Sequence, residues 1–388
     1  MIPLSPDDAA VIAQRVYLLK NASIGELKAS GGNLGCEGQF KVQDNSRFSG
    51  RSGILTFHQL TGFGYICEGE GIHQGEILVA TRGTKTGFDL VTDFHTGVRR
   101  GPTGTLVHIG FQQVWESYAE ELKAFLRGRN PTHIHCVGHS LGGALATLNA
   151  DYFTANKLPF SLYTFGCPRV GPWSFSQELT RGVGAANIYR VSHTTDPVAM
   201  VPSFPFVHAP YEGKHYTIVR DGLVWIDAHF MGGYSRSVAG KSWSSLVNTQ
   251  VVLDWSDAVA KAWLEAVKGG GGGIMMYVGA SLDMIAQALR WIIRKAAAAG
   301  LIVACNGLGG AMTAADLLVT LLNKTAELSK EMAEDIKTVM SAILRFLGRN
   351  AVKIGDVTQQ FIRWIFDQLY GAISSMANRA MMGDGKSE

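Results

Sequence analysis

The run Gly138-His-Ser-Leu-Gly142 constrains the fold of this chain more than any other feature. A short β-forming stretch precedes it, and a stretch of small, helix-forming residues follows it. A G-x-S-x-G run between a strand and a helix predicts a sharp turn that projects the serine hydroxyl from the carboxyl edge of a sheet. Glycine is needed at both ends, because a Cβ there would collide with the neighbouring strand or helix. We therefore take Ser140 as the candidate nucleophile, on an elbow formed with Gly138, His139 and Gly142.

Apolar runs alternate with helical segments on both sides of this elbow. Residues 76–81, 161–165 and 188–191 read as short buried strands, and residues 111–127 have helical spacing. Strands that alternate with helices predict a largely parallel sheet covered on both faces. The expected fold class is α/β, an α/β-hydrolase fold followed by an α-helical C-terminal region.

The composition changes at five consecutive glycines, residues 269–273. With 388 residues the chain is long for one hydrophobic core, and such a glycine run is typical of a flexible linker. We expect a hydrolase domain over 1–268, a linker over 269–273 and a helical domain over 274–388. The helices of that last domain are predicted at 274–299, 313–347 and 357–382.

Charge and cysteine content limit the classes of partner. The formal net charge of +3 is too small to indicate nucleic acid, although mild attraction to an anionic membrane surface is compatible with it. The five cysteines have no metal-ligand spacing, so we expect reduced thiols and neither a metal nor a cofactor. A Cys36–Cys67 disulfide is the less favoured alternative.

The first residues, Met1 to Asp8, contain neither a basic segment nor an apolar one. From this we expect no N-terminal signal peptide. The chain would be made in the cytoplasm and exported by a route that is independent of a signal peptide.

A serine nucleophile needs a histidine to take its proton and a carboxylate to orient that histidine. Asp196 follows a buried strand by a few residues and precedes a proline, which makes it the candidate acid. Four histidines, His193, His208, His215 and His229, lie nearby or downstream. His229 lies in a loop before a glycine pair and is favoured as the base, with His208 as the second choice.

Two backbone or side-chain donors are needed for an oxyanion hole. The N–H of Leu141, immediately after the nucleophile, is one. The second is expected from the loop after the strand at 76–81, where Gly83 permits a close approach and Thr84 offers both an N–H and a hydroxyl. A simple strand-ending turn explains these residues equally well.

Six motifs in this order resemble the class 3 lipases. They are Val79-Ala-Thr-Arg-Gly-Thr84, Val107-His-Ile-Gly-Phe111, the elbow extended to Ala144, Thr164-Phe-Gly-Cys-Pro-Arg-Val-Gly171, the acid loop at 191–198, and Ala228-His229. By position the resemblance implies a Ser140, Asp196 and His229 triad with Thr84 in the oxyanion hole. It also implies that His193 structures its loop. The family's lid follows the oxyanion loop, and here that segment is short, with Gly87, Phe88, Leu90 and Val91 as its candidate residues.

The resemblance covers about residues 75 to 232, and the helical tail makes the chain look most like bacterial phospholipases A1 or lipase-type effectors. Three functions stay open. The first is a phospholipase A1 that cleaves the carboxylic esters of membrane phospholipids through an acyl-enzyme. The second is a triacylglycerol lipase or carboxylesterase, and the third a membrane-binding or pore-forming effector with a secondary hydrolase core. The expected partners are a phospholipid membrane surface and a cognate inhibitory or accessory protein, with no nucleic acid.

Overall fold

The structure is a computed structural model. It describes residues 2–20, 22–52, 59–83, 97–193, 195–202, 206–211, 213–214, 216–218, 226–247, 257–268, 285, 288, 291–292, 295, 330–347 and 359–383. The predictions for Thr84, for the whole candidate lid within residues 84–96 and for the linker at 269–273 concern residues outside this set.

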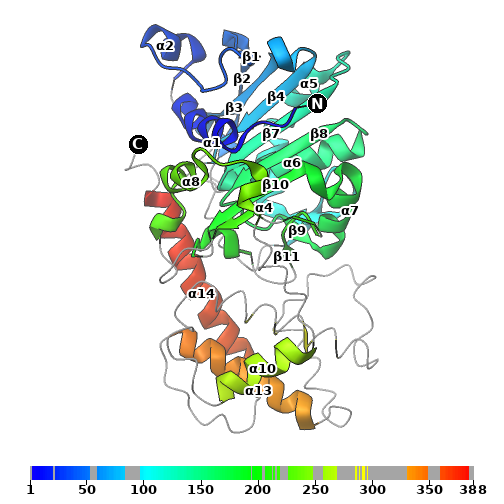
Figure 1. The fold of residues 1–388 in the computed structure, drawn as a ribbon, viewed down its shortest axis with the longest axis vertical. Coiled ribbons are helices and arrows are strands. Elements are labelled where there is room, and N and C mark those ends of the chain that lie inside the picture. Colours follow the sequence, from blue (N-terminus) through cyan, green and yellow to red (C-terminus); the bar gives the residue numbers. More distant parts are fainter. Residues whose placement is uncertain are drawn as a thin grey trace.

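A mostly parallel sheet forms the centre of the molecule (Figure 1). Its strand order is β1-β3-β4-β7-β8-β10-β12, with β2 paired to β3. Strands β4, β7, β8, β10 and β12 pair parallel to one another, and β1, β2 and β3 pair antiparallel at the other edge. The strand bounds are β1 Phe40–Lys41, β2 Arg47–Ser52, β3 Gln59–Gly69, β4 Glu76–Thr81, β7 His133–His139, β8 Phe160–Phe165, β10 Ile188–His193 and β12 Tyr216–Ile218. This arrangement confirms the predicted α/β-hydrolase fold class.

The central strands form where the sequence is mostly apolar, with polar residues such as His133 and Arg190 buried among the apolar ones. Every residue of β4, β7, β8 and β10 is buried, as expected for strands covered on both faces. Two short ribbons lie outside the sheet, β5 (Val98–Arg100) with β6 (Leu106–His108) and β9 (Gly171–Pro172) with β11 (Phe206–Val207).

Alternate residues of the strands enter two different hydrophobic cores. Ile77 and Val79 of β4 pack on the side of α4 (Ile109–Glu116), α5 (Ala119–Leu126), α6 (Leu141–Ala155) and α7 (Trp173–Val183). Leu78 and Ala80 pack on the side of α1 (Pro6–Arg15) and α8 (Met231–Val238). The period of two along each strand therefore divides the interior into two layers.

The N-terminal helix begins where the capping signal predicts. The side chain of Ser5 accepts a hydrogen bond from the N–H of Asp8, and Pro6 occupies the first turn. Helix α1 continues as the 3-10 turn η1 (Val16–Lys20), and α2 (Ile24–Ala29) follows with a capping box at Ser23.

The described C-terminal helices are α10 (Asp257–Lys268), α13 (Lys330–Phe346) and α14 (Gln359–Gly383). Helix α13 lies within the predicted helix at 313–347, and α14 lies within the one predicted at 357–382 except for one further residue at its end. Helix α10 packs against α13 and so joins the helical region, although the predicted domain boundary after residue 268 placed it with the hydrolase. Leu264 and Val267 belong to the same hydrophobic core as residues of α13 and α14, and this burial explains why α10 packs with the tail helices. Among the described helices, none is long and apolar enough to cross a membrane.

Helix α14 connects the tail to the hydrolase (Figure 1). It contacts two 3-10 turns, η5 (Val198–Met200) and η6 (Ile226–Ala228). These turns lie next to the candidate acid and the candidate base in the sequence. The tail and the loops of the candidate site are thus in direct contact.

Candidate active site

Ser140 lies on a strained turn between β7 and α6. Its φ of 58° is one of two positive values recorded for non-glycine residues in the described part of the chain. Its N–H donates to the carbonyl of Phe165 at 3.0 Å, which fixes the turn against β8. A Cβ at Gly138 would lie 2.2 Å from the carbonyl oxygen of Gly142, and one at Gly142 would lie 2.4 Å from that of Thr81. Only glycine fits at these two positions, as the sequence predicts.

His229 contacts both the serine and the acid. Its Nε2 lies 2.8 Å from Ser140 Oγ, and its Nδ1 lies 3.0 and 3.1 Å from the two carboxylate oxygens of Asp196. His229 directly follows η6 and is fully buried. Its ring stacks on the ring of His139, with 4.7 Å between the centroids. With a proton on Nδ1, the ring donates to the carboxylate and accepts from the serine hydroxyl.

The Asp196 carboxylate has further donors besides His229. The N–H of Val198 donates to Oδ1 at 2.8 Å, and the hydroxyl of Tyr234 donates to Oδ2 at 2.6 Å. Complete burial alone would raise the pKa of Asp196, but His229 and these hydrogen bonds together hold that pKa below its ordinary value. Asp196 is therefore an anion at neutral pH, although it lies in the interior.

Tyr234 and His193 form a support behind the acid. Tyr234 accepts a hydrogen bond from the N–H of His193 at 3.0 Å while its hydroxyl donates to Asp196. The two rings stack at 4.0 Å, and His193 Nδ1 lies 2.6 Å from the carbonyl of Ala228. His193 thus ends the strand that leads to the acid and contacts Ala228, the residue before the base. Sequence reasoning assigned His193 a loop-structuring role but missed Tyr234, because nothing in its spacing from His229 points to a carboxylate.

His139 lies between the N-terminal segment and the base. Its Nε2 donates to the carbonyl of His229 at 2.9 Å, and its Nδ1 lies 3.0 Å from the hydroxyl of Tyr17 on η1. The sequence predicts His139 as part of the elbow, but it gives no sign that Tyr17 contacts it, because the two residues are far apart in the chain.

The predicted oxyanion loop reaches the elbow. Strand β4 pairs with β7 so that Thr81 lies beside Gly138, and Thr81 Oγ1 donates to the carbonyl of Gly142 at 2.7 Å. A Cβ at Gly83 would lie 3.5 Å from the backbone nitrogen of Leu141. The backbone nitrogen of Leu141 therefore lies close to the start of this loop.

Arg82 anchors the loop from inside the protein. Its Nε donates to the carbonyl of Gly62 and its Nη1 to the carbonyl of Gly83 at 2.7 Å. Burial lowers the pKa of Arg82 to about 10, which leaves the guanidinium charged at neutral pH. The sequence places Arg82 in a family motif without giving it a role.

His208, the second choice for the base, makes a different contact. His208 Nε2 lies 2.7 Å from the carbonyl of Ala199, so the second choice for the base is held in a loop of its own. His215 lies outside the described residues. Of the described histidines that the sequence offered as the base, His229 is the one that contacts both Ser140 and Asp196.

One cluster of metal-ligating residues lies among the described residues, away from Ser140. His73, Glu76 and His135 bring three ligand atoms within 4.8 Å of one another. The sequence analysis expected no metal and did not identify this cluster, since its three residues come from a turn and two strands. The four described cysteines are buried free thiols.

Residues 78–206 match the family model described as Lipase (class 3). This stretch contains Ser140 and Asp196, and His229 lies beyond it. The match supports the resemblance to class 3 lipases that the motifs indicate.

Two curated relatives are lipases from fungi. A secreted mono- and diacylglycerol lipase of Fusarium solani is 41% identical over 137 residues, which are 34% of this chain and 40% of that protein. A secreted mono- and diacylglycerol lipase of Penicillium cyclopium is 32% identical over 146 residues, 35% of this chain and 47% of that protein. The chain thus spans less than half the length of either relative. These matches support the prediction of an ester hydrolase.

Solved lipase structures are also similar. The nonglycosylated LIP2 lipase of Yarrowia lipolytica is 20% identical with a TM-score of 0.43, covering 56% of this chain and 79% of that one. The mono- and diacylglycerol lipase of Aspergillus oryzae is 22% identical with a TM-score of 0.40, covering 55% and 78%.

The relatives correct one prediction from the sequence. Both curated fungal relatives are secreted lipases, which contradicts synthesis without a signal peptide and export by a route independent of one. That prediction is wrong, because the composition of the first residues does not determine how a lipase of this kind is exported. Neither relative is bacterial or named a phospholipase, so the finer resemblance to bacterial phospholipases A1 gains no support from them.

Proposed function

We propose that this protein is a serine ester hydrolase that acts on acylglycerols. The observation that carries the proposal is the unbroken series of hydrogen bonds from Ser140 through His229 to Asp196, on a strained elbow at the carboxyl edge of the sheet. The similarity to mono- and diacylglycerol lipases supports the substrate class.

In the proposed reaction, Ser140 Oγ attacks the ester carbonyl while His229 Nε2 takes the hydroxyl proton. Asp196 accepts a hydrogen bond from the protonated Nδ1 of His229. Its negative charge stabilises the imidazolium that forms when Nε2 takes the serine proton. The same proton then passes from His229 to the leaving alcohol, which leaves an acyl group on Ser140. Water repeats the sequence and releases the fatty acid. The donors from Val198 and Tyr234 keep Asp196 ionised and oriented throughout.

The oxyanion that forms during each attack needs two donors. We propose the N–H of Leu141 as one and Thr84 as the other. Supporting this assignment, Gly83, the residue before Thr84, lies against the backbone nitrogen of Leu141. Replacing Thr84 by Val should lower kcat by ~10²-fold with little change in KM, because the hydroxyl acts only as charge develops. Steady-state kinetics on a soluble ester measure both constants. A KM effect without a kcat effect would contradict the assignment.

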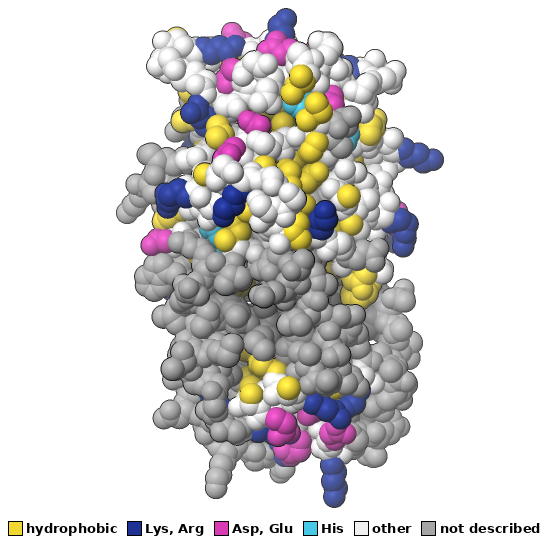
Figure 2. All heavy atoms as spheres, in the orientation of Figure 1, with side chains coloured by type: hydrophobic (Ala, Val, Ile, Leu, Met, Phe, Trp, Pro, Cys, Tyr) yellow, Lys and Arg dark blue, Asp and Glu magenta, His cyan; other side chains and the backbone are white. Residues whose placement is uncertain are grey.

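We propose a lipid surface as the partner of the protein. Over the described residues of the face in Figure 2, hydrophobic side chains form a band between scattered basic and acidic ones. Ile72 and Trp173 are among the large hydrophobic residues that are exposed. A cognate inhibitory or accessory protein, expected from the sequence, stays a prediction.

A substrate panel distinguishes the proposed activity from a phospholipase A1. Diacylglycerol, triacylglycerol and phosphatidylcholine with the same acyl chains are presented in mixed micelles, and fatty-acid release is followed for the wild-type protein and for Ser140→Ala. We expect Ser140-dependent release from the acylglycerols to exceed release from phosphatidylcholine. Faster cleavage of phosphatidylcholine, confined to the sn-1 chain, would instead favour the phospholipase A1 hypothesis.

A further inference from the structure

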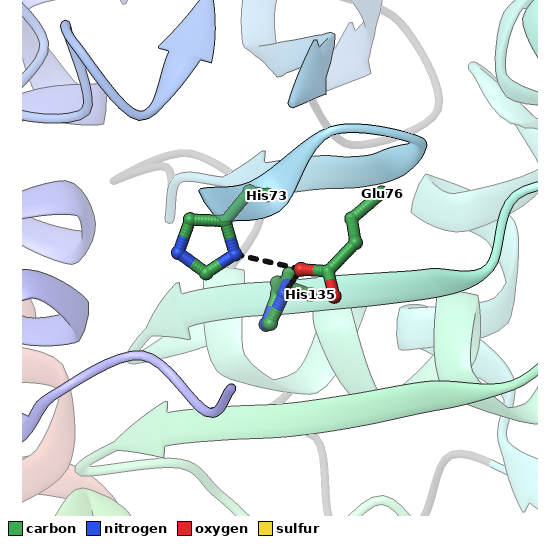
Figure 3. Close-up of side chains that lie close together, drawn as sticks. All are labelled: His73, Glu76 and His135. Carbon is green, nitrogen blue, oxygen red and sulfur yellow. Dashed lines mark hydrogen bonds and ion pairs between the residues drawn. The ribbon is translucent and has the colours of Figure 1, made fainter. Parts of the chain in front are cut away.

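At the opposite end of β7 from Ser140, three buried side chains converge on one point (Figure 3). His73 comes from the 3-10 turn η3 (Gly71–His73), Glu76 begins β4, and His135 lies on β7. His73 Nδ1 lies 2.6 Å and His135 Nε2 lies 2.7 Å from the same carboxylate oxygen, Glu76 Oε2. Two imidazole nitrogens and one carboxylate oxygen therefore face a common centre.

Among the described residues, no lysine or arginine forms a recorded ion pair with Glu76. The ion pairs recorded for this carboxylate among the described residues are those with His73 and His135. The residue is 6% exposed, and burying a carboxylate without a compensating cation is costly. A divalent cation between the three side chains would supply that compensation while both rings stay neutral.

The surroundings hold the two rings in place. The ring of Phe40 stacks on His73 at 4.9 Å and meets His135 edge-on at 5.8 Å. The other nitrogen of His135, Nδ1, lies 3.3 Å from the hydroxyl of Tyr163. A metal-binding histidine commonly has such a partner on its second ring nitrogen, which fixes the tautomer that leaves the first one free to bind.

We propose that His73, Glu76 and His135 bind a single Zn²⁺ ion. Two imidazoles and one carboxylate are a common ligand set for zinc, with the fourth position taken by solvent. Metal–ligand distances of about 2.0–2.2 Å require ligand atoms about 3.3 Å apart in a tetrahedron. The imidazole nitrogens now lie 2.6 and 2.7 Å from Glu76 Oε2, and small rotations of the side chains would increase these distances to that value. Calcium and magnesium fit less well, because they prefer oxygen ligands.

The position assigns the ion a structural role. Strand β7 runs five residues from His135 to Ser140, which is about 16 Å at the usual rise per residue. The ion would join η3 and β4 to β7 at the end of the sheet away from the triad. It takes no part in the proposed ester chemistry, so this inference stands whether or not the acylglycerol activity is correct.

The experiment uses the full chain, stripped with a chelator and titrated with Zn²⁺ alone. Calorimetry gives stoichiometry and Kd, thermal unfolding gives Tm, and Co²⁺ in place of Zn²⁺ gives a visible absorption spectrum. We expect one Zn²⁺ per chain, a Co²⁺ band of four-coordinate intensity, and a Tm rise of about 5 °C or more when free Zn²⁺ is about 100-fold above Kd.

Three variants remove one ligand each while they keep a hydrogen-bonding group in place: His73→Asn, Glu76→Gln and His135→Gln. His133→Gln is the matched control, since His133 is buried on the same strand but its Nε2 lies 2.9 Å from Ser161 Oγ. Each ligand variant should weaken Zn²⁺ binding by at least ~10-fold and lose the Co²⁺ band, while the control keeps both. Should His135→Gln fail to fold, His73→Asn on the surface turn carries the test. No Zn²⁺ binding by the wild type, or wild-type affinity in His73→Asn, would show that the cluster is only a hydrogen-bonded network.

Discussion

The two ends of β7 carry the same kinds of side chain and differ in what they can do. At the carboxyl end, His229 bridges Asp196 and the hydroxyl of Ser140. At the amino end, Glu76 bridges two imidazoles, from His73 and His135. Both groups are buried, and both depend on a carboxylate beside an imidazole.

The two ends differ in the side chain that the histidine–carboxylate pair contacts. At the carboxyl end a serine sits on a strained turn at the start of α6, and the N–H of Leu141, the proposed oxyanion donor, follows it directly. At the amino end all three groups are of types that bind metal ions, and no nucleophile is among the described cluster. A histidine–carboxylate pair therefore does not define a function by itself. The backbone around it decides between proton transfer and the binding of a cation.

The largest expected effect is the loss of the nucleophile. Ser140→Ala should lower kcat by ~10³-fold or more, because the residual rate then depends on the oxyanion hole and substrate binding alone. Hydrolysis of a soluble ester by the purified variant measures this, and an unchanged Tm shows that the fold is intact. A variant that kept a tenth of wild-type turnover would remove Ser140 from the mechanism.

Removal of the base should cost about as much as removal of the nucleophile. His229→Ala is expected to lower kcat by ~10³-fold, and combining it with Ser140→Ala should add little, because triad members act as a unit. His208→Ala is the control, since His208 contacts the carbonyl of Ala199 instead of the serine. An inactive His208→Ala beside a nearly normal His229→Ala would reverse the assignment of the base.

Asp151 extends the comparison, because it is a buried carboxylate whose recorded hydrogen bonds, among the described residues, come from Thr103 instead of a histidine. Its oxygens accept from the N–H and hydroxyl of Thr103, and burial raises its pKa to about 6 from an ordinary 3.8. The folded protein therefore holds this proton more tightly than the unfolded chain. Between pH 3.8 and about 6 the free energy of unfolding should fall as pH rises, and the deficit persists at higher pH.

Asp151→Asn should remove that deficit. We expect a gain of up to about 2 kcal/mol in the free energy of unfolding at pH 8 and almost none at pH 3.5. Urea denaturation of wild type and variant at the two pH values measures the difference. An equal change at both pH values would mean that titration of Asp151 is not its cause.

The smallest effect concerns the support behind the acid. Tyr234→Phe removes the donor to Asp196 Oδ2 and leaves the N–H of His193 without its acceptor, while the ring stacking stays possible. We expect about a 10-fold loss of kcat, the size of one charge-assisted hydrogen bond. Tyr189→Phe is the matched control, a buried tyrosine on the same sheet. Equal kcat losses in both variants would indicate a general packing effect.

Local patterns in the sequence predict much of the fold and of the candidate site. The continuous apolar runs predict β4, β8 and β10, and the glycines of the elbow predict the turn at Ser140. Each of these features is set by residues close together in the chain, which is why a single sequence contains them.

Contacts between segments that are distant in the chain could not be predicted from the sequence. Tyr17 approaches His139 from the N-terminal segment, and His73 approaches His135 from a turn. Helix α10 packs on α13 across the predicted linker; its amphipathic pattern indicates a buried face but not the element that covers it. Such pairings depend on tertiary packing, and neither spacing nor hydrophobic period encodes them.

The central claim is that Ser140 becomes a nucleophile because His229 and Asp196 activate it. A fluorophosphonate probe tests this most directly, since it bonds covalently to an activated serine and to no other. The wild-type protein should gain one adduct, located on Ser140 by peptide mass spectrometry, and His229→Ala should react far more slowly while His208→Ala reacts normally. An adduct on another residue, or equal labelling of wild type and His229→Ala, would contradict the claim.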